Sequence, residues 1–129
     1  MGFFSELFKQ PPPSVTFTPV RGEQLFVGES FYQSALVGLL KARGHAPASL
    51  KNCRLPINES FVAHLTPEAR NPHDPNAVAV VVDNHVVAYL SRANAAEYRR
   101  TLGTKSGEAT VALWVKPGGK GIVSVWPQE

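Results

Sequence analysis

The densest group of chemically useful residues in the chain is the segment 71–80, which reads NPHDPNAVAV. Within it, His73 carries an imidazole and Asp74 a carboxylate, and the asparagines and prolines around them are typical of tight turns. An apolar run over residues 77–82 follows at once. Because a rigid turn at the mouth of a buried strand holds its polar side chains in place, this segment predicts a binding site on a small β-barrel.

The polar groups of this segment each allow two roles. Asp74 can accept hydrogen bonds from its own turn, as aspartate before proline commonly does, or it can contact a hydroxyl group or a base edge of a ligand. A carboxylate has enough acceptor sites to do both. His73 can stack on a ligand or face solvent at the tip of a loop. Asn71 and Asn76 are expected to form turns.

Aromatic and basic side chains elsewhere can complete such a site. Tyr32 is a candidate because its hydroxyl favours a wet edge, whereas Phe31 begins an apolar helical stripe and is expected in the core more readily than at a ligand. Tyr89 alternates with Val87 and Leu90 in a pattern that does not determine whether its side chain faces the core or the surface. Arg92 starts a predicted helix, whose N–H groups favour an anion. Lys116 flanks a glycine-rich turn that a nucleic-acid strand can approach closely, and a solvated surface is the alternative for both cations.

The sequence gives little support to catalysis or metal binding. Cys53, His64 and Asp74 have the types of a nucleophile, a base and an orienting acid, but no local motif joins them. The four histidines lack the spacing of metal ligands. The run Gly-Gly-Lys-Gly at 118–121 lacks the spacing of a phosphate-binding loop. We therefore expect a binding protein that is not an enzyme, with no catalytic residue, metal or cofactor.

Length and composition limit the class of protein. The 129 residues suit one domain with a buried core, and 43% of them are apolar, which argues against disorder. A net charge of +3 is compatible with a polyanionic partner. The single cysteine, Cys53, excludes a disulfide framework and favours a cytoplasmic location. No segment approaches membrane-spanning length.

The first 14 residues are expected to form a helix and a spacer ahead of a barrel domain over residues 15–129. Four apolar side chains in the expected helix recur at helical spacing: Phe3, Phe4, Leu7 and Phe8. Three consecutive prolines then favour an extended spacer. Such a helix can fray or pack on its own domain, or it can anchor the chain to a partner protein, to a second copy or to a membrane surface.

The next elements are predicted from turn and cap patterns. Residues 15–27 favour one or two strands around a turn at Gly22. Ser30 followed by Gln33 has the pattern of a capping box and predicts a helix that starts there and ends at Gly44. A polar loop is expected after this helix.

The remaining chain predicts short strands and one more helix. Residues 77–82 are nearly all apolar, which is typical of a strand buried on both faces. Ser91 is placed to cap a helix that Gly103 ends. Strands are expected over 61–65, 77–82, 86–90, 111–115 and 122–126, with a helix over 92–102. A tight turn at Asp83-Asn84-His85 is expected to join the strands 77–82 and 86–90 in a hairpin. Many short strands with glycine and proline turns indicate a mainly β fold with two helices, a small OB-like β-barrel.

Three blocks of sequence, in this order and spacing, resemble the HIRAN domain family. They are Val27-Gly28-Glu29-Ser30-Phe31-Tyr32, Asn71-Pro72-His73-Asp74-Pro75-Asn76-Ala77-Val78-Ala79-Val80 and Val87-Ala88-Tyr89-Leu90-Ser91-Arg92. The resemblance spans roughly residues 26–126, and the middle block is the most specific. Members of the family occur as modules of helicase-like DNA-repair translocases and as small stand-alone bacterial proteins.

The resemblance implies an OB-like barrel that binds single-stranded DNA at a 3′ end. In that mode aromatic side chains stack on bases and a carboxylate contacts the terminal hydroxyl. Stacking tolerates any base and contributes roughly 1–3 kcal/mol per base. Matching the motifs residue by residue aligns Phe31, Tyr32 and Asp74 with the family's site, and His73 and Tyr89 stand at two further positions of it. We therefore expect these five side chains to bind DNA. Arg92, at the start of a predicted helix, and Lys116, beside a glycine-rich turn, are expected to contact phosphate.

Three positions differ from the DNA-end binders. His73 stands where they carry tyrosine, Ser30 where they carry arginine, and Tyr89 where they carry histidine. The change at Ser30 removes a positive charge. It motivates an alternative function, a protein-interaction module that docks a partner through the N-terminal apolar helix and retains a vestigial nucleic-acid pocket.

Overall fold

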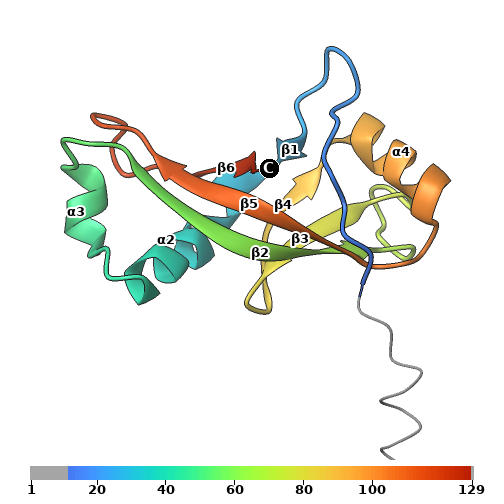
Figure 1. Ribbon diagram of the computed structural model, residues 1–129, viewed down its shortest axis with the longest axis horizontal. Coiled ribbons are helices and arrows are strands. Elements are labelled where there is room, and N and C mark those ends of the chain that lie inside the picture. The colour runs from blue at the N-terminus through green and yellow to red at the C-terminus, as the bar shows by residue number, and fades with distance from the viewer. Residues whose placement is uncertain (1–11, 129) are drawn as a thin grey trace, which may run out of the picture.

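The computed structural model describes residues 12–128, which fold mainly into β-structure (Figure 1). Six strands, two substantial helices and two short helical segments follow one another along the chain. In chain order they are β1 (Phe26–Val27), η1 (Glu29–Tyr32), α2 (Gln33–Ala42), α3 (Pro47–Lys51), β2 (Ile57–Pro67), β3 (Val78–Val82), β4 (His85–Leu90), α4 (Arg92–Leu102), β5 (Gly107–Val115) and β6 (Ser124–Pro127). The predicted mainly β class with two helices is confirmed.

All six strands belong to one antiparallel sheet in the order β1-β4-β3-β2-β5-β6. The sheet curls into a nearly closed barrel, consistent with the small OB-like barrel predicted from the sequence (Figure 1). Strand β2 is the longest, with 11 residues. Because it pairs with β3 along one side and with β5 along the other, it joins the two halves of the sheet.

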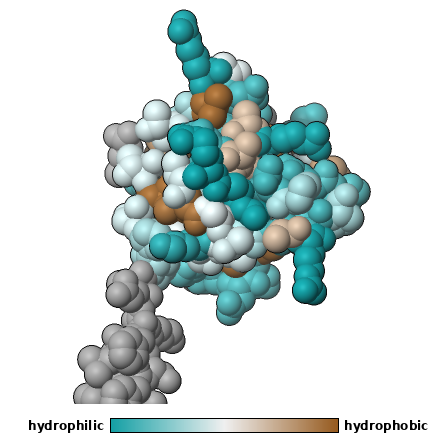
Figure 2. Space-filling model, turned by 90° about the vertical axis from the view of Figure 1, so that its right-hand side faces the viewer, coloured by the Kyte–Doolittle hydropathy of each residue, from teal (hydrophilic) through white to brown (hydrophobic). Residues whose placement is uncertain are grey.

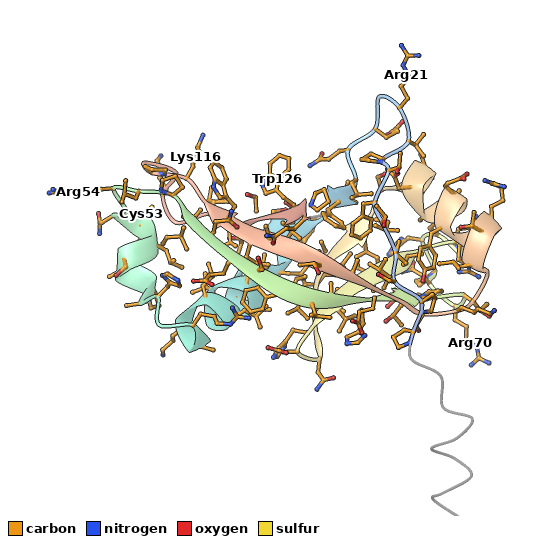
Figure 3. All side chains as sticks on the ribbon, in the orientation of Figure 1. Arg21, Cys53, Arg54, Arg70, Lys116 and Trp126 are labelled. Atoms are coloured by element: carbon orange, nitrogen blue, oxygen red, sulfur yellow. The ribbon has the colours of Figure 1, made fainter. Side chains whose placement is uncertain are left out.

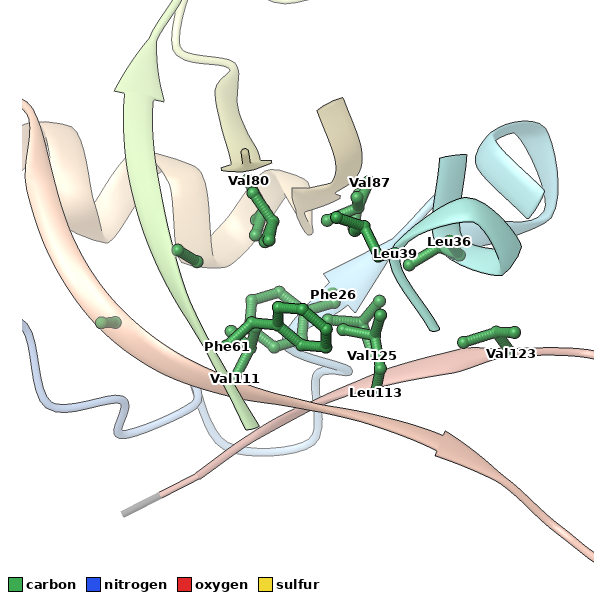
Figure 4. Packing of buried hydrophobic residues seen from close by; sticks show 14 of the residues in the cluster. Phe26, Leu36, Leu39, Phe61, Val80, Val87, Val111, Leu113, Val123 and Val125 are labelled. Carbon is green, nitrogen blue, oxygen red and sulfur yellow. The ribbon is translucent and has the colours of Figure 1, made fainter. Parts of the chain in front are cut away.

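The core fills the inside of this curled sheet. Side chains alternate along β2, so that Phe61 is buried while its neighbour Val62 is exposed, as expected of a strand with one face toward water. Figure 4 shows Phe61 and Phe26 close together in the core, with Leu36 and Leu39 of α2 packed beside the strands. Burying each such side chain contributes roughly 1.5–3 kcal/mol. Helix α2 therefore packs its apolar stripe into the same core as the strands.

The central hairpin and the helix after it form as their turn and cap residues predict. Asp83 and Asn84 have φ of 47° and 65°, the left-handed backbone of a type I′ turn, which these residue types tolerate. The Ser91 hydroxyl accepts a hydrogen bond from the amide of Asn94 and so caps α4. The helix ends before Gly103, as predicted.

Strands β1 and β6 are the edges of the sheet, and side chains from η1 and α2 lie against β6 where a further strand would pair. The Gln33 side-chain amide donates to the carbonyl oxygen of Val123 at 2.8 Å and accepts from its N–H at 2.9 Å. The Glu29 carboxylate accepts from the N–H of Val125 at 3.4 Å. These contacts join Gln33, at the start of α2, to the chain entering β6, and join Glu29, in η1, to β6 itself.

The same contacts overturn the predicted capping box of Ser30 and Gln33. Gly28 precedes η1 and Tyr32 precedes α2, so Ser30 lies inside a 3₁₀ turn and not at a cap. The Gln33 side-chain amide instead bonds to both backbone groups of Val123 and also donates to the carbonyl oxygen of Glu29. The predicted end of the helix is confirmed, because α2 stops two residues before Gly44, whose φ is 92°.

The segment before β1 is irregular along most of its length, so the strands predicted over residues 15–27 are wrong apart from β1 itself. The predicted turn is present at Gly22, whose φ is 82°. The N–H of Val20 donates to the Oδ1 atom of Asn94 at 2.8 Å. The side chain of Asn94 in α4 thus hydrogen-bonds a backbone N–H group that was expected to pair with another strand.

Two further differences concern the chain around β2. Helix α3 occupies part of the predicted polar loop, and Pro47 at its first position favours a helix start. Strand β2 runs well beyond the predicted residues 61–65. It does so because its whole length up to Leu65 pairs with β5, a partner distant in sequence that no local pattern reveals.

The surface at the α4 end is mostly hydrophilic, with small and separate hydrophobic areas (Figure 2). Within residues 12–128, no helix combines the length and the apolar character needed to cross a membrane. The predicted N-terminal helix with Phe3, Phe4, Leu7 and Phe8 lies outside the described residues.

Candidate functional site

A groove of about 390 Å³ opens where β1, η1, the β2–β3 loop, the end of β4 and the start of α4 meet. Six of the seven residues predicted to bind DNA line it: Phe31, Tyr32, His73, Asp74, Tyr89 and Arg92. They come from segments far apart in the sequence. The pairing of Val27 with Tyr89 in β1 and β4 brings two of these segments together.

A second hollow, of about 690 Å³, lies between residues 14–19 and the β5–β6 end of the sheet. It is larger, but its wall holds one charged residue, Glu108, and one aromatic residue, Phe17. The groove instead combines three aromatic rings, an imidazole, a carboxylate and a guanidinium. Convergent groups of this kind indicate a binding site better than volume does, so the groove is the candidate site.

The β2–β3 loop is held in shape by its own asparagine and aspartate side chains. The Oδ1 atom of Asn71 accepts from the N–H of His73 at 2.8 Å and from that of Asp74 at 3.2 Å. The Oδ1 atom of Asp74 accepts from the N–H of Asn76 at 2.9 Å. The predicted turn-forming role of Asp74 is thereby confirmed for one of its oxygens.

The other oxygen of Asp74 faces Arg92 at the start of α4. Its Oδ2 atom lies 3.9 Å from the Nε atom of Arg92, and the side chain of Asp74 is 19% exposed while that of Arg92 is 81% exposed. The guanidinium also donates to the carbonyl oxygen of His73 at 3.4 Å. An ion pair this long and this exposed is weak, so a ligand can replace either partner.

Two tyrosines form the wall opposite this loop. The rings of Tyr32 and Tyr89 lie 6.3 Å apart between centroids and are tilted by 40°. The Tyr89 hydroxyl donates to the Oε1 atom of Glu68 at 2.8 Å. Burial raises the pKa of Tyr89 well above its ordinary value, and the hydrogen bond to the Glu68 carboxylate raises it further. Tyr89 is therefore a neutral, fixed wall of the groove at neutral pH.

Glu68 is a residue that the sequence analysis missed. Besides Tyr89, its Oε1 atom accepts from the side-chain amide of Asn71 at 3.1 Å. Glu68 thus ties the tyrosine wall to the loop that carries Asp74. The available signal was weak: an acidic residue at the start of a turn-rich segment, with its partner 21 positions away.

Phe31 does not belong to the core, so the expectation from the sequence was wrong. Its residue surface is 85% exposed, although it lines the groove. The cause is η1, because a 3₁₀ turn has three residues per turn and shifts the phase of the apolar stripe. The buried stripe of the helix begins at Leu36 instead. A large ring is left at the rim of the groove.

Lys116 is the one predicted contact that the fold does not bring to the groove. Figure 3 places it near Cys53 and Arg54 at one end of the molecule. Arg70, which shares the β2–β3 loop with Asn71, lies at the other end. Among residues 12–128, the wall of the groove therefore has one Lys or Arg side chain, Arg92, beside the carboxylate of Asp74.

No family model matches the chain, and no curated protein or solved structure matches it.

Proposed function

We propose that the chain is a HIRAN-type nucleic-acid-binding module that takes the 3′ end of single-stranded DNA into this groove and catalyses no reaction. The observation that carries the proposal is Phe31, an 85% exposed ring at the rim of a groove whose wall also contains Tyr32 and Tyr89. Exposed rings beside a hollow are what unstacked bases need, because every base has a flat face that can stack.

The polar groups of the groove suit the end of a strand. The Asp74 carboxylate is an acceptor for a terminal hydroxyl, while Arg92 is a donor for the adjacent phosphate. With a single cation in the wall, few phosphates are contacted, so binding weakens only gently as salt is raised. His73 adds a third ring type at the mouth. The resemblance to the HIRAN family supports a DNA-binding role. The single cysteine supports a location in the cytoplasm.

Fluorescence anisotropy tests the proposal with one labelled oligonucleotide in three forms: a single strand with a 3′-hydroxyl, the same strand with a 3′-phosphate, and the duplex. We expect the 3′-hydroxyl strand to bind most tightly. Asp74→Asn keeps the acceptor for the turn and should reduce the preference for the hydroxyl. Arg92→Ala should weaken binding to every single strand alike.

Equal binding of single strand and duplex would contradict recognition of a strand end. No binding to any form would contradict nucleic-acid binding in the groove altogether. It would favour the protein-interaction alternative, for which deletion of residues 1–13 and a measurement of self-association or partner binding is the direct test.

A further inference from the structure

The net positive charge of the protein is concentrated at one place. Two segments, 46–58 and 109–128, contain four Lys and Arg residues and no Asp or Glu. These are Lys51, Arg54, Lys116 and Lys120, and all four are exposed. The other nine Lys and Arg residues of the chain are matched by ten Asp and Glu residues. Without these four side chains the protein would carry no excess of positive charge.

The two segments meet in the fold. The Sγ atom of Cys53 lies 3.6 Å from the carbonyl oxygen of Lys116. A Cβ atom placed on Gly121 would lie 3.0 Å from Cγ of Lys51, so the stem of that lysine packs on the β5–β6 loop. Figure 3 shows Lys116 and Arg54 at the same end of the molecule. We call this end, with its four cations, the basic tip. Within residues 12–128, none of the four forms an ion pair.

The basic tip also carries the two most exposed large aliphatic side chains of the described residues. Leu55 is 77% exposed and Ile122 is 63% exposed. Leu55 follows Arg54 directly and Ile122 lies two positions after Lys120, so each aliphatic residue is close in the sequence to a cation. Neither belongs to a strand or a helix that needs it for packing. Aliphatic side chains exposed next to cations match a partner that offers both charge and apolar surface.

We propose that the basic tip binds an anionic lipid surface, with the four cations on lipid headgroups and Leu55 and Ile122 inserted at the boundary of the acyl chains. Each basic residue near such a surface adds favourable energy, and inserted aliphatic groups add more. Nucleic acid is the competing polyanion. A phosphodiester backbone would bind the cations but has no use for the aliphatic groups, which is why lipid fits the tip better.

Co-sedimentation of the full-length protein with vesicles tests this proposal. One set of vesicles contains phosphatidylcholine alone and the other contains added phosphatidylglycerol. We expect binding only to the anionic set. Lys116→Glu with Lys120→Glu should weaken it on the order of a hundredfold. Leu55→Ser with Ile122→Ser, which leaves the charge unchanged, should weaken it about tenfold.

Arg21→Glu with Lys105→Glu is the matched control, because it makes the same change of net charge at exposed positions outside the tip. We expect this control to bind anionic vesicles within about threefold of the wild type. Circular dichroism and urea denaturation of each variant separate lost binding from lost folding. Equal losses for the tip and control reversals would overturn the proposal, as would unchanged binding by the Leu55/Ile122 variant.

Binding of duplex DNA by the wild type, lost with the Lys116/Lys120 reversal while anionic vesicles are not bound, would assign the tip to nucleic acid instead and also overturn the proposal. The groove is tested separately, since the preference for a 3′-hydroxyl strand does not depend on the tip. Failure of one proposal therefore leaves the other standing.

Discussion

The groove and the basic tip lie in different parts of one barrel and have opposite electrostatic character. The groove sets one guanidinium, that of Arg92, against the Asp74 carboxylate and surrounds both with rings. The tip gathers four cations with no acid in the same segments. A mildly basic net charge therefore does not by itself mark the groove. Here the charge lies elsewhere, and the groove is lined by aromatic rings and hydrogen-bonding groups.

The two regions also differ in how they are held. The loop that bears Asp74 is fixed by the Asn71 side chain, which accepts hydrogen bonds from the N–H groups of His73 and Asp74 and donates one to Glu68. The tip is fixed mainly by close backbone approach, because Gly119 and Gly121 leave room for the stems of Lys116 and Lys51. A rigid loop suits a ligand of defined shape, whereas long lysine stems on a glycine-rich turn suit a surface without fixed geometry.

The largest effect that separates the two regions is expected for Phe31. Phe31→Ala removes the most exposed ring of the groove and should weaken binding of single-stranded DNA by roughly 1–3 kcal/mol, or about 5- to 150-fold in Kd. Its binding to anionic vesicles should not change. Anisotropy and co-sedimentation on the same preparation measure both.

Trp126→Ala is the control for Phe31, since Trp126 is an exposed ring, 53% accessible, on β6 outside the groove. It should leave DNA binding near the wild-type value. Equal weakening by both variants would mean that exposed aromatic surface matters wherever it lies, and the distinction between the two regions would then be lost.

A smaller effect, on stability, is expected for Glu68. Glu68→Ala leaves the Tyr89 hydroxyl and the Asn71 amide without their acceptor and should lower the free energy of unfolding by roughly 1–2 kcal/mol. Urea denaturation measures it. Glu68→Gln keeps an oxygen acceptor and should recover part of the loss. Glu23→Ala, at an exposed carboxylate with no side-chain partner within residues 12–128, should have little effect; a loss as large as that of Glu68→Ala would contradict the proposed role of Glu68.

The smallest expected effect is on the titration of the Tyr89 hydroxyl at high pH. Burial, together with the hydrogen bond to Glu68, raises the pKa of Tyr89 above the value near 10 that tyrosine has in an unfolded chain. The folded state thus holds this proton more tightly, and the stability it contributes is complete below about pH 10 and is lost as the pH rises further.

Ultraviolet absorbance of tyrosinate follows this step. Tyr89→Phe should remove one late-titrating tyrosine and leave Tyr98, whose pKa burial also raises. Glu68→Gln should move the Tyr89 step to lower pH. An unchanged titration curve in Glu68→Gln would show that the carboxylate does not act on the phenol.

Local sequence chemistry predicted the elements whose causes are local. The Asp83–Asn84 turn and the Ser91 cap each depend on residues within a few positions, and both form as expected. The same holds for the Asn71–Asn76 loop, whose hydrogen bonds span two or three residues. Because the loop, the cap and the neighbouring strand were predicted together, most of the groove could be named in advance.

The failures have long-range causes. Gln33 was assigned to a cap because its partner Val123 is 90 positions away. Residues 15–27 were assigned to strands because the hydrogen bond from Val20 to Asn94 spans 74 positions. Phe31 was misplaced because a single 3₁₀ turn shifts the helical phase. Lys116 flanks a glycine-rich turn, a local pattern that favours close approach of a nucleic-acid strand but does not reveal the distance of the turn from the groove.

The side chain of Gln33 has a consequence for how copies of this protein meet. An edge strand normally offers unpaired N–H and carbonyl groups to the edge of another molecule, which is a route to aggregation. The Gln33 amide has the same donor and acceptor pair as a peptide group, and it occupies both backbone groups of Val123. The Gln33 side chain therefore makes the two hydrogen bonds that a neighbouring strand would make at this position. Because both backbone groups of Val123 are already paired within the molecule, a second copy of the chain cannot add a strand at Val123.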